Sequence, residues 1–220
     1  MGGAPEQDFL RVMAALLERT TILTPYGKTT WLPLVAALAA AGVFCALWFP
    51  WGLVIVLPPL AFVLWFFRDP ERRSDAPENA LISPADGQVV EIAAAEEPEF
   101  LKTPATRISI FMSVVSVHVN RAPCDATVEW VKPLDGTFLN AMRAESGLEN
   151  VRTLIALRRP DGSPLLVKQV AGLIARRIIC PLKPGDRLRR GQRFGMIKFG
   201  SRVEIFLPRD KAFDPQVRLG

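Results

Sequence analysis

The longest feature of the hydrophobic pattern is a stretch without charged residues, from Thr29 to Phe67. A helix needs about 20 apolar residues to cross the hydrocarbon core of a bilayer, so this stretch is long enough for two short spans. We expect spans at 31–49 and 51–67, separated by Pro50-Trp51-Gly52, because proline and glycine favour a turn. The pattern predicts a transmembrane helical hairpin over residues 29–67. The alternative is a hydrophobic hairpin buried inside a soluble fold.

Cationic residues flank both ends of this stretch and are absent from its central turn. By the positive-inside tendency, both ends should face the cytoplasm, which predicts a cell (inner) membrane protein with residues 68–220 on the cytoplasmic side. A cleavable signal peptide fits poorly, because residues 1–28 precede the apolar run and no small-residue cleavage site follows it. Within 1–28, residues 9–17 predict an amphipathic helix that lies on the membrane or packs on the rest of the protein. The flanking cations are Arg11, Arg19, Lys28, Arg68, Arg72 and Arg73.

After residue 68 the pattern changes to short alternating runs broken by glycine and proline. Asp-Gly pairs at 86–87, 135–136 and 161–162 and Pro184-Gly185-Asp186 are typical of turns. Helical character is weak apart from the stretch 139–150. Residues 68–220 therefore predict one mainly β domain, a compact sandwich or barrel. The expected strands are 88–93, 107–112, 126–131, 153–158, 165–171, 176–180, 195–199 and 203–207.

The segment 183–195 has the rhythm of barrel-sandwich modules that carry lipoyl or biotinyl groups. In those modules the loaded lysine lies at a hairpin tip within a short motif. Met196-Ile197-Lys198 lacks the flanking residues of that motif. We therefore take the rhythm as a sign of a barrel-sandwich-like fold, not of cofactor attachment.

Charge and cysteine content restrict the classes of partner and cofactor that we expect. The net charge is +5, and arginines make the C-terminal half basic, which suits either anionic lipid headgroups or an ordinary solvated face. Nucleic-acid binding is not expected, because no recognition motif or interleaved aromatic residues accompany the charge. Cys45, Cys124 and Cys180 do not pair sensibly, and a cytoplasmic domain would keep them reduced. With one histidine and no CxxC motif, we expect no metal site.

Three residues could carry chemistry together: Asp86 at a predicted turn, His118 in an apolar run, and Ser201 between two strands. A serine hydroxyl becomes a good nucleophile when a base removes its proton and a carboxylate orients that base. A lone histidine in an apolar run is otherwise more often structural. No G-x-S-x-G elbow surrounds Ser201, so the usual hydrolase signal is missing. Gly200 directly precedes Ser201, which leaves its carbonyl open to attack by the neighbouring hydroxyl.

Several motifs, in order, resemble one enzyme family. They are Phe67-Arg68-Asp69-Pro70-Glu71-Arg72, Ser83-Pro84-Ala85-Asp86-Gly87, 111–113 leading to 117–123, 170–178, and Phe199-Gly200-Ser201-Arg202-Val203. Each is weak alone, but their order and spacing resemble the short, prokaryotic type of phosphatidylserine decarboxylase, a pyruvoyl-dependent membrane enzyme. The resemblance spans nearly the whole chain.

The resemblance implies self-cleavage between Gly200 and Ser201. Chains 1–200 and 201–220 would stay associated, and Ser201 would become a covalent pyruvoyl cofactor. His118 would be the base and Asp86 its orienting partner. The mature enzyme would convert phosphatidylserine to phosphatidylethanolamine in membrane lipids. The predicted hairpin would then anchor the active site at the membrane that holds its substrate.

One position departs from the family pattern. Longer members carry a second histidine three residues after the first, where this chain has Arg121. Either His118 serves both cleavage and decarboxylation, or another group takes one step. Two other functions stay open on the residues alone: a membrane-anchored barrel-sandwich adaptor without catalysis, and a serine hydrolase that keeps Ser201 intact. The sequence leaves undecided whether the lipid is ester- or ether-linked and whether the chain forms a homo-oligomer.

Overall fold

The computed structural model describes residues 22–143, 145–173, 177–209 and 216–219 of the 220-residue chain. The chain divides into two compact units, Met1–Arg73 and Ser74–Gly220. We describe each unit by itself. The amphipathic helix expected at 9–17 lies outside the described residues.

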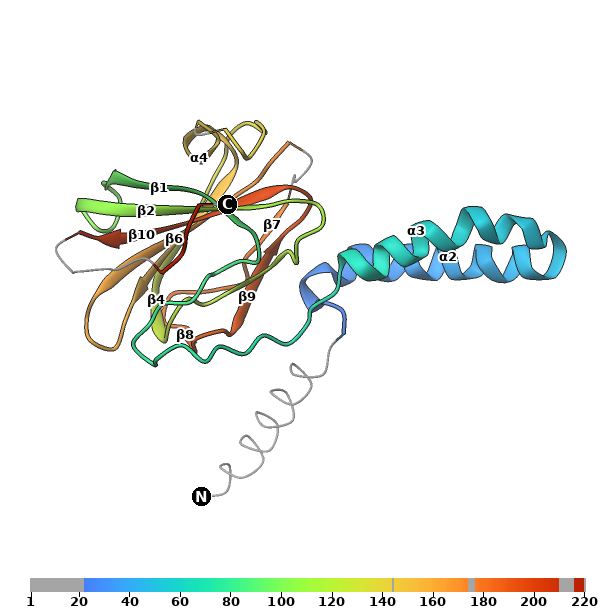
Figure 1. Cartoon of the computed structure of the whole chain (residues 1–220), viewed down its shortest axis with the longest axis horizontal. Helices are drawn as coiled ribbons and strands as arrows, with labels where there is room; N and C mark the ends of the chain where they lie inside the picture. Colours follow the sequence, from blue (N-terminus) through green and yellow to red (C-terminus); the bar gives the residue numbers. More distant parts are fainter. Residues whose placement is uncertain (1–21, 144, 174–176, 210–215, 220) are drawn as a thin grey trace, which may run out of the picture. The chain divides into compact units, whose positions relative to one another are not determined.

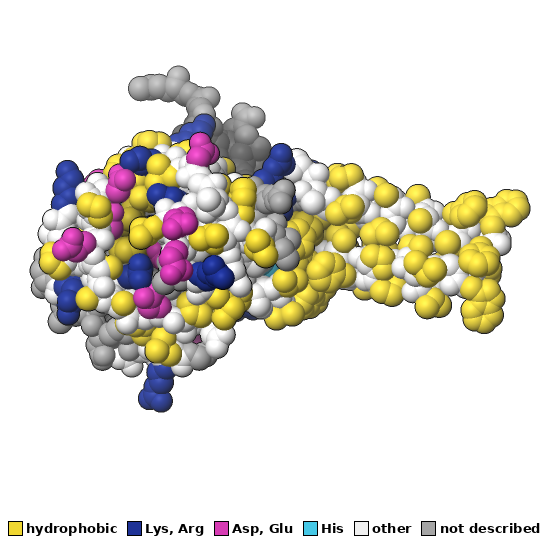
Figure 2. All heavy atoms as spheres, turned by 90° about the horizontal axis from the view of Figure 1, so that it is seen from above, with side chains coloured by type: hydrophobic (Ala, Val, Ile, Leu, Met, Phe, Trp, Pro, Cys, Tyr) yellow, Lys and Arg dark blue, Asp and Glu magenta, His cyan; other side chains and the backbone are white. Residues whose placement is uncertain are grey.

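The first unit is a helical hairpin (Figure 1). Helix α2 spans Lys28–Trp48 and helix α3 spans Leu53–Phe66, with the short 3-10 turns η1 (Pro25–Gly27) and η2 (Pro50–Gly52) before each. The base of the hairpin is closed by a hydrogen bond from the Thr24 amide to the Phe67 carbonyl, 2.9 Å long. Figure 2 shows hydrophobic side chains covering both helices. The predicted hairpin is therefore present as a pair of apolar helices.

The two helices differ in length. The 21 residues of α2 extend over about 31 Å at 1.5 Å per residue, close to the thickness of a hydrocarbon core. The 24-residue helical stretch Pro25–Trp48 is long and apolar enough to cross a membrane, whereas Pro50–Phe66 is a shorter apolar helix. The second helix, α3, contains Pro58 and Pro59. It ends at Phe66, one residue before the end of the span expected at 51–67.

The second unit contains a seven-stranded antiparallel sheet in the order β1-β2-β10-β6-β5-β4-β8 (Figure 1). Its last strand in sequence, β10, lies between β2 and β6 and not at an edge. The strand bounds are β1 Gln88–Glu97, β2 Thr103–Met112, β4 Ala126–Leu134, β5 Arg152–Arg158, β6 Pro164–Val170, β8 Arg187–Leu188 and β10 Ser201–Pro208.

A second, three-stranded sheet has the order β3-β9-β7, with β3 at Val119–Arg121, β7 at Ile178–Ile179 and β9 at Arg193–Ile197. Side chains from both sheets, such as Val167 and Val203 from the large sheet and Phe194 and Ile197 from the small one, form the main hydrophobic core. A smaller core, including Leu166 and Phe206, lies on the opposite face of the large sheet. The arrangement is a β-sandwich, and the expected mainly β fold with an N-terminal apolar helix is confirmed.

Each predicted strand coincides with an observed one, but β3 and β8 were not predicted. Both are two or three residues long and exist through pairing with distant segments. Helical character was expected at 139–150; among the described residues of this stretch, α4, Ser146–Glu149, is helical and the others are mostly loop. The hairpin expected around Asp161-Gly162 joins β5 to β6, with Gly162 at a φ of +80°.

Candidate active site

Ser201 lies at the end of the large sheet where β2 stops. It is the first residue of β10 and pairs with Met112, the last residue of β2. On the other side of β2, strand β1 starts with Gln88 opposite Phe111. Asp86 precedes Gln88 by two residues, and His118 follows Met112 by six. The strand order β1-β2-β10 therefore places Asp86 and Ser201 at the end of the sheet where β2 stops, and the chain leaves β2 at this end toward His118.

Backbone hydrogen bonds hold the Asp86 and His118 segments side by side. The Arg121 amide donates to the Pro84 carbonyl and the Ile82 amide to the Pro123 carbonyl, both at 2.9 Å. The segment before Asp86 thus runs antiparallel to the one that begins with His118. The His118 carbonyl accepts from the Ile197 amide at 3.3 Å, four residues before Ser201. His118 and Ser201 are fully buried, while Asp86 is half-buried.

The backbone before Ser201 has an unusual conformation. Phe199 and Gly200 both have a positive φ, +58° and +62°. Glycine adopts this left-handed region freely, but a bulky residue such as phenylalanine does so only where its surroundings impose it, at a cost of about 1–3 kcal/mol. The Gly200-Ser201 bond thus follows two residues in a strained, turned segment.

Gly172 explains how the Gly200 carbonyl is fixed. A Cβ atom added to Gly172 would overlap the Gly200 carbonyl oxygen and would lie 3.0 Å from the carbonyl carbon. Only glycine therefore lets the two backbones approach this closely. The Asn150 side chain holds the neighbouring residue in place, since its Nδ2 donates to the Ala171 carbonyl at 2.7 Å.

The Ser201 hydroxyl suits a group that is chemically consumed. Its Oγ is buried and has no hydrogen-bond partner among the described residues. Leaving a buried hydroxyl unsatisfied costs about 1–3 kcal/mol, so a serine kept only for structure would be a poor choice here. A reaction that consumed this hydroxyl would remove the cost, so the site fits a group made from Ser201.

A buried ionic cluster lies immediately after Ser201. Arg202 is 1% exposed, and its guanidinium group donates to Glu91 Oε2 at 2.8 Å and to Ser109 Oγ at 2.7 Å. Its Nε lies 2.9 Å from Glu204 Oε1, and Glu204 Oε2 lies 3.1 Å from Lys168 Nζ. Arg202 also donates to the Arg143 carbonyl at 3.2 Å. The residue after Ser201 is thereby tied to β1, β2, β10 and the loop before α4.

This cluster perturbs two pKa values in ways that fit its geometry. Burial opposes ionisation of Glu91, but hydrogen bonds and charges from Arg107 and Arg202 outweigh burial and lower its pKa. Burial lowers the pKa of Lys168, while Glu204 acts in the opposite direction. Sequence reasoning quoted Arg202 only as part of the motif around Ser201 and missed this role. The one signal was the alternation along β10, which sets Arg202 and Glu204 on the face opposite Val203.

Asn120 and Gln169 connect the two sheets behind the site. Gln169 Nε2 donates to Asn120 Oδ1 at 2.7 Å, and Asn120 Nδ2 contacts Met112 Sδ at 3.7 Å. Both residues are fully buried, and Gln169 lies opposite Val203 in the β6–β10 pair. These buried amides fix the segment after His118 against the start of β10. Sequence reasoning did not single out either residue.

Arg121 and Lys198 are cationic residues close in sequence to the proposed site residues. Arg121, at the position of the second histidine in longer family members, is 9% exposed and donates to the Gly191 carbonyl at 3.2 Å. Lys198 is 7% exposed, and burial, together with the charge of Arg177, lowers its pKa. Arg121 therefore has a structural contact of its own at the position where a second histidine would stand.

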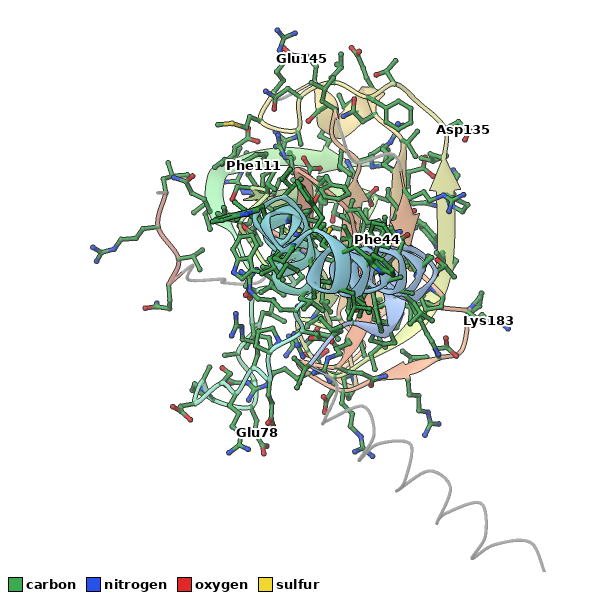
Figure 3. The ribbon with its side chains drawn as sticks, turned by 90° about the vertical axis from the view of Figure 1, so that its right-hand side faces the viewer. Phe44, Glu78, Phe111, Asp135, Glu145 and Lys183 are labelled. Atoms are coloured by element: carbon green, nitrogen blue, oxygen red, sulfur yellow. The ribbon has the colours of Figure 1, made fainter. Side chains whose placement is uncertain are left out.

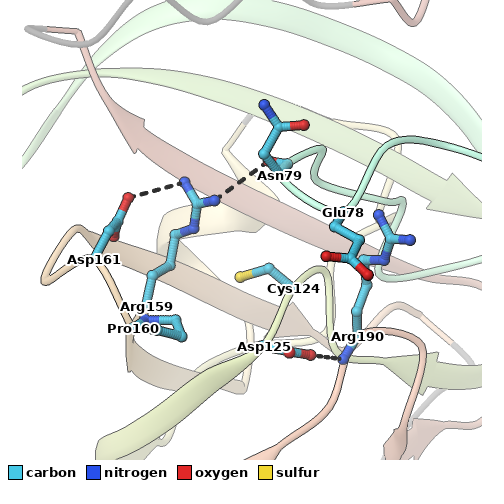
Figure 4. A pocket seen from close by; sticks show the side chains of 8 residues that line it. All are labelled: Glu78, Asn79, Cys124, Asp125, Arg159, Pro160, Asp161 and Arg190. Carbon is cyan, nitrogen blue, oxygen red and sulfur yellow. Dashed lines mark hydrogen bonds and ion pairs between the residues drawn. The ribbon is translucent and has the colours of Figure 1, made fainter.

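A surface pocket of about 590 Å³ lies elsewhere on the second unit (Figure 4). It is lined by neither Ser201 nor His118. Burial raises the pKa of its Cys124 thiol to about 11, so the thiol is protonated and a weak nucleophile at neutral pH. Arg190 and Arg159, which also line it, bond to backbone carbonyls of residues 76–80. The pocket is therefore a poor candidate for catalysis.

Comparison with known proteins agrees with this geometry. The model of the family described as phosphatidylserine decarboxylase matches residues 60–220. A phosphatidylserine decarboxylase proenzyme of Magnetococcus marinus is 48% identical over 157 residues, 71% of each chain. One from Ralstonia nicotianae is 48% identical over 77% of this chain and 75% of its own. One from Carboxydothermus hydrogenoformans is 44% identical over 86% of this chain and 87% of its own. The match runs through Asp86, His118 and the Gly200-Ser201 bond, and the chain belongs to the phosphatidylserine decarboxylase family.

Proposed function

We propose that this chain decarboxylates phosphatidylserine to phosphatidylethanolamine with a pyruvoyl group that it makes from its own Ser201. The family is one of carboxy-lyases, and the relatives carry the name proenzyme, which implies self-processing. The observation that carries the proposal is the geometry of one bond: Gly200-Ser201 follows two residues of positive φ, and it precedes a buried hydroxyl without a hydrogen-bond partner among the described residues.

In the processing step, Ser201 Oγ attacks the Gly200 carbonyl carbon, the peptide C–N bond breaks, and an ester forms. Removal of the Ser201 Cα proton then expels the ester oxygen, which leaves with residue 200 as a carboxylate, and residue 201 becomes dehydroalanine. Water hydrolyses dehydroalanine to the pyruvoyl group and ammonia. The attack is intramolecular, so a fixed carbonyl greatly favours it.

His118 is the proposed base, and Asp86 is its proposed orienting partner. The support is the antiparallel pairing of their segments, and the start of β10 at Ser201 at the same end of the sheet. His118 is the only histidine of the chain, and Arg121 occupies the position of the second histidine of longer relatives. We therefore assign proton transfer in both processing and decarboxylation to His118.

The pyruvoyl group supplies a carbonyl that condenses with the substrate amine and accepts the electron pair left when carbon dioxide departs. The position of that group would be set by β10, which pairs with β2 from Ser201 to Pro208 and with β6 from Arg202 to Phe206. Because a strand paired on both sides separates with difficulty, chain 201–220 would stay bound to chain 1–200 after cleavage.

The remaining parts of the proposal concern the membrane. We assign residues 29–67 to a membrane-anchoring hairpin, residues 1–28 to an amphipathic segment and residues 68–220 to the catalytic domain. Support comes from the apolar helix Pro25–Trp48 and the second, shorter apolar helix. The cations on both flanks support a cytoplasmic position for the catalytic domain at the cell membrane.

Mass analysis of the purified full-length chain under denaturing conditions tests the proposal. Active protein should contain a chain ending at Gly200 and a 20-residue fragment with a blocked, pyruvoyl N-terminus. Ser201→Ala should remain full length and should not release carbon dioxide from phosphatidylserine vesicles. A wild-type chain that releases carbon dioxide without being cleaved would exclude pyruvoyl chemistry, and an uncleaved chain that hydrolyses the lipid instead would favour a serine hydrolase. A chain that is neither cleaved nor active would favour an adaptor.

A further inference from the structure

The second unit exposes large hydrophobic side chains mainly on three loops. Within its described residues, seven such side chains are exposed, and five of them lie on these loops. Isolated exposed apolar residues are common on soluble proteins, but a group of them marks an interaction surface. We call the five the apolar rim: Val114, Val115, Met142, Leu148 and Leu173.

Each of the three loops contacts the segment around Ser201. The first follows Met112, the partner of Ser201, and turns at Ser113–Ser116 with Val114 and Val115 at its tip, where the Ser116 amide donates to the Ser113 carbonyl at 3.0 Å. The second holds Leu173 beside Gly172, which packs on the Gly200 carbonyl.

The third loop runs from residue 135 through the one-turn helix α4 and carries Met142 and, within α4, Leu148. It reaches the site through the Arg143 carbonyl, which accepts from Arg202. The Ala141 methyl group also lies 3.3 Å from where a Cβ of Gly172 would be. All three loops that carry the apolar rim thus adjoin the segment around Ser201, which is itself fully buried.

The chain between helix α3 and the second unit is short, so it limits how far the second unit can move from the apolar helices. Helix α3 ends at Phe66 and the second unit begins at Ser74, so residues 67–73 join them. Seven extended residues span at most about 25 Å. If the apolar helices lie in a bilayer, the second unit cannot leave its surface.

If the substrate is a lipid, the face of the second unit that carries the entrance to Ser201 must lie against the bilayer. Withdrawing acyl chains from a bilayer costs about 0.8 kcal/mol for each CH₂ group, so the serine headgroup must reach Ser201 while the chains stay in the bilayer. The loops around Ser201 are therefore the ones that must lie against the lipid. Arg143 and Arg177 are exposed on the same loops and would attract an anionic surface, while Glu145 also points outward there (Figure 3).

We propose that the apolar rim inserts into the headgroup region of an anionic bilayer and forms the entrance through which the lipid headgroup reaches Ser201. This inference rests on the proposed function. It differs from anchoring by the hairpin, because it assigns a membrane-binding surface to the catalytic unit itself.

The kinetic test uses full-length, self-processed enzyme and two forms of phosphatidylserine. One is long-chain lipid in anionic vesicles, and the other is a short-chain lipid below its micelle concentration. Val115→Asp and Leu173→Asp should each lower kcat/KM on vesicles about tenfold, because the free energy of burying one such side chain corresponds to about that factor. On the short-chain lipid, kcat/KM should stay within about twofold of the wild type. Leu219→Asp is the matched control, since Leu219 is 64% exposed, as Val115 is, but lies outside the rim.

Equal losses on both substrates would mean that the rim shapes the reaction site, and unchanged rates on vesicles would mean that it touches no lipid. Either result overturns the proposal. A rim variant that turns a wild-type dimer into a monomer would overturn it in favour of a second copy of the chain. Wild-type enzyme inactive on both substrates would refute the proposed function and not the rim.

A second measurement does not depend on activity. An environment-sensitive fluorophore on Val115→Cys, in a Cys45→Ser background, should shift to the blue on reconstitution into anionic vesicles, and the same label on Leu219→Cys should not. Background labelling should be low, because burial raises the pKa of both Cys124 and Cys180 to about 11. A Val115 label that still reports water in vesicles overturns the proposal.

Discussion

Replacing Gly172 with alanine should slow self-cleavage without removing any reacting group. The added methyl group would overlap the Gly200 carbonyl oxygen, which must move by about 1 Å to reach the 3.0 Å below which real Cβ contacts essentially never fall. The neighbouring backbone offers little room for Gly172 to retreat, because the Ala141 methyl group lies 3.3 Å from the same point and Asn150 holds Ala171.

The size of the effect follows from that displacement. Intramolecular attack needs the hydroxyl and the carbonyl carbon about 3–3.5 Å apart and aligned, and a misplacement of about 1 Å can cost about 100-fold in rate. We therefore expect Gly172→Ala to self-cleave about 100 times more slowly than the wild type. The assay is pulse-labelled synthesis followed by denaturing electrophoresis, with the rate taken from the decay of the full-length chain.

Gly195→Ala is the matched control for general destabilisation. A Cβ on Gly195 would overlap the Ile179 carbonyl oxygen in the β7–β9 pair, so it crowds a backbone in the same way without touching Gly200. Both variants should lose stability, but only Gly172→Ala should accumulate folded, uncleaved chain. Wild-type cleavage in Gly172→Ala, or equal slowing in Gly195→Ala, would refute the reasoning.

Three further predictions concern the charged cluster and the buried thiols. Arg202→Met should destabilise the protein by about 3 kcal/mol in thermal unfolding, because buried Glu204 loses a partner, and Arg202→Lys should recover part of this; full stability of Arg202→Met would contradict the contacts described. The lowered pKa of Glu91 stabilises the fold above its unfolded pKa of about 4.3, and this contribution is lost as pH falls through the folded value. Glu91→Gln should therefore lower the urea midpoint at pH 7, and its difference from the wild type should shrink as the pH falls below about 4.3. Alkylation of Cys124 and Cys180, followed by peptide mass, should be slow at pH 8 and rise with pH toward their pKa of about 11; rapid labelling of native protein at pH 8 would contradict the raised pKa of both thiols.

The parts of the fold that sequence reasoning predicted are those with a strong local pattern. The uncharged stretch 29–67 is a helical hairpin, and the alternating runs of β2, β5, β6 and β10 are strands, because one face of each must be buried. Strands β3 and β8 were not predicted, because they have two or three residues and owe their conformation to pairing with β9 and β4, respectively. No local window contains that information.

The candidate site also has features that the local sequence predicts and features that only long-range contacts determine. Ser201, His118 and Asp86 could be proposed from residue type and family resemblance, but their approach to one another depends on the order β1-β2-β10 in the sheet. Nothing in the local sequence shows that Arg202 is buried. It is buried because Glu91 and Ser109, more than 90 residues earlier in the chain, come to lie beside it. Long-range contacts decide such positions.

The two sides of the Gly200-Ser201 bond are held in opposite ways, and this bears on why cleavage there would be productive. Upstream, Phe199 and Gly200 are in left-handed conformations, and the phenylalanine alone stores about 1–3 kcal/mol that can relax once the bond is broken. Downstream, Arg202 is fixed by four partners, and β10 is paired on both sides. Cutting the bond would therefore free the residues before it and leave residue 201 in place. A reactive group made at residue 201 would inherit a position that was already set before the cut.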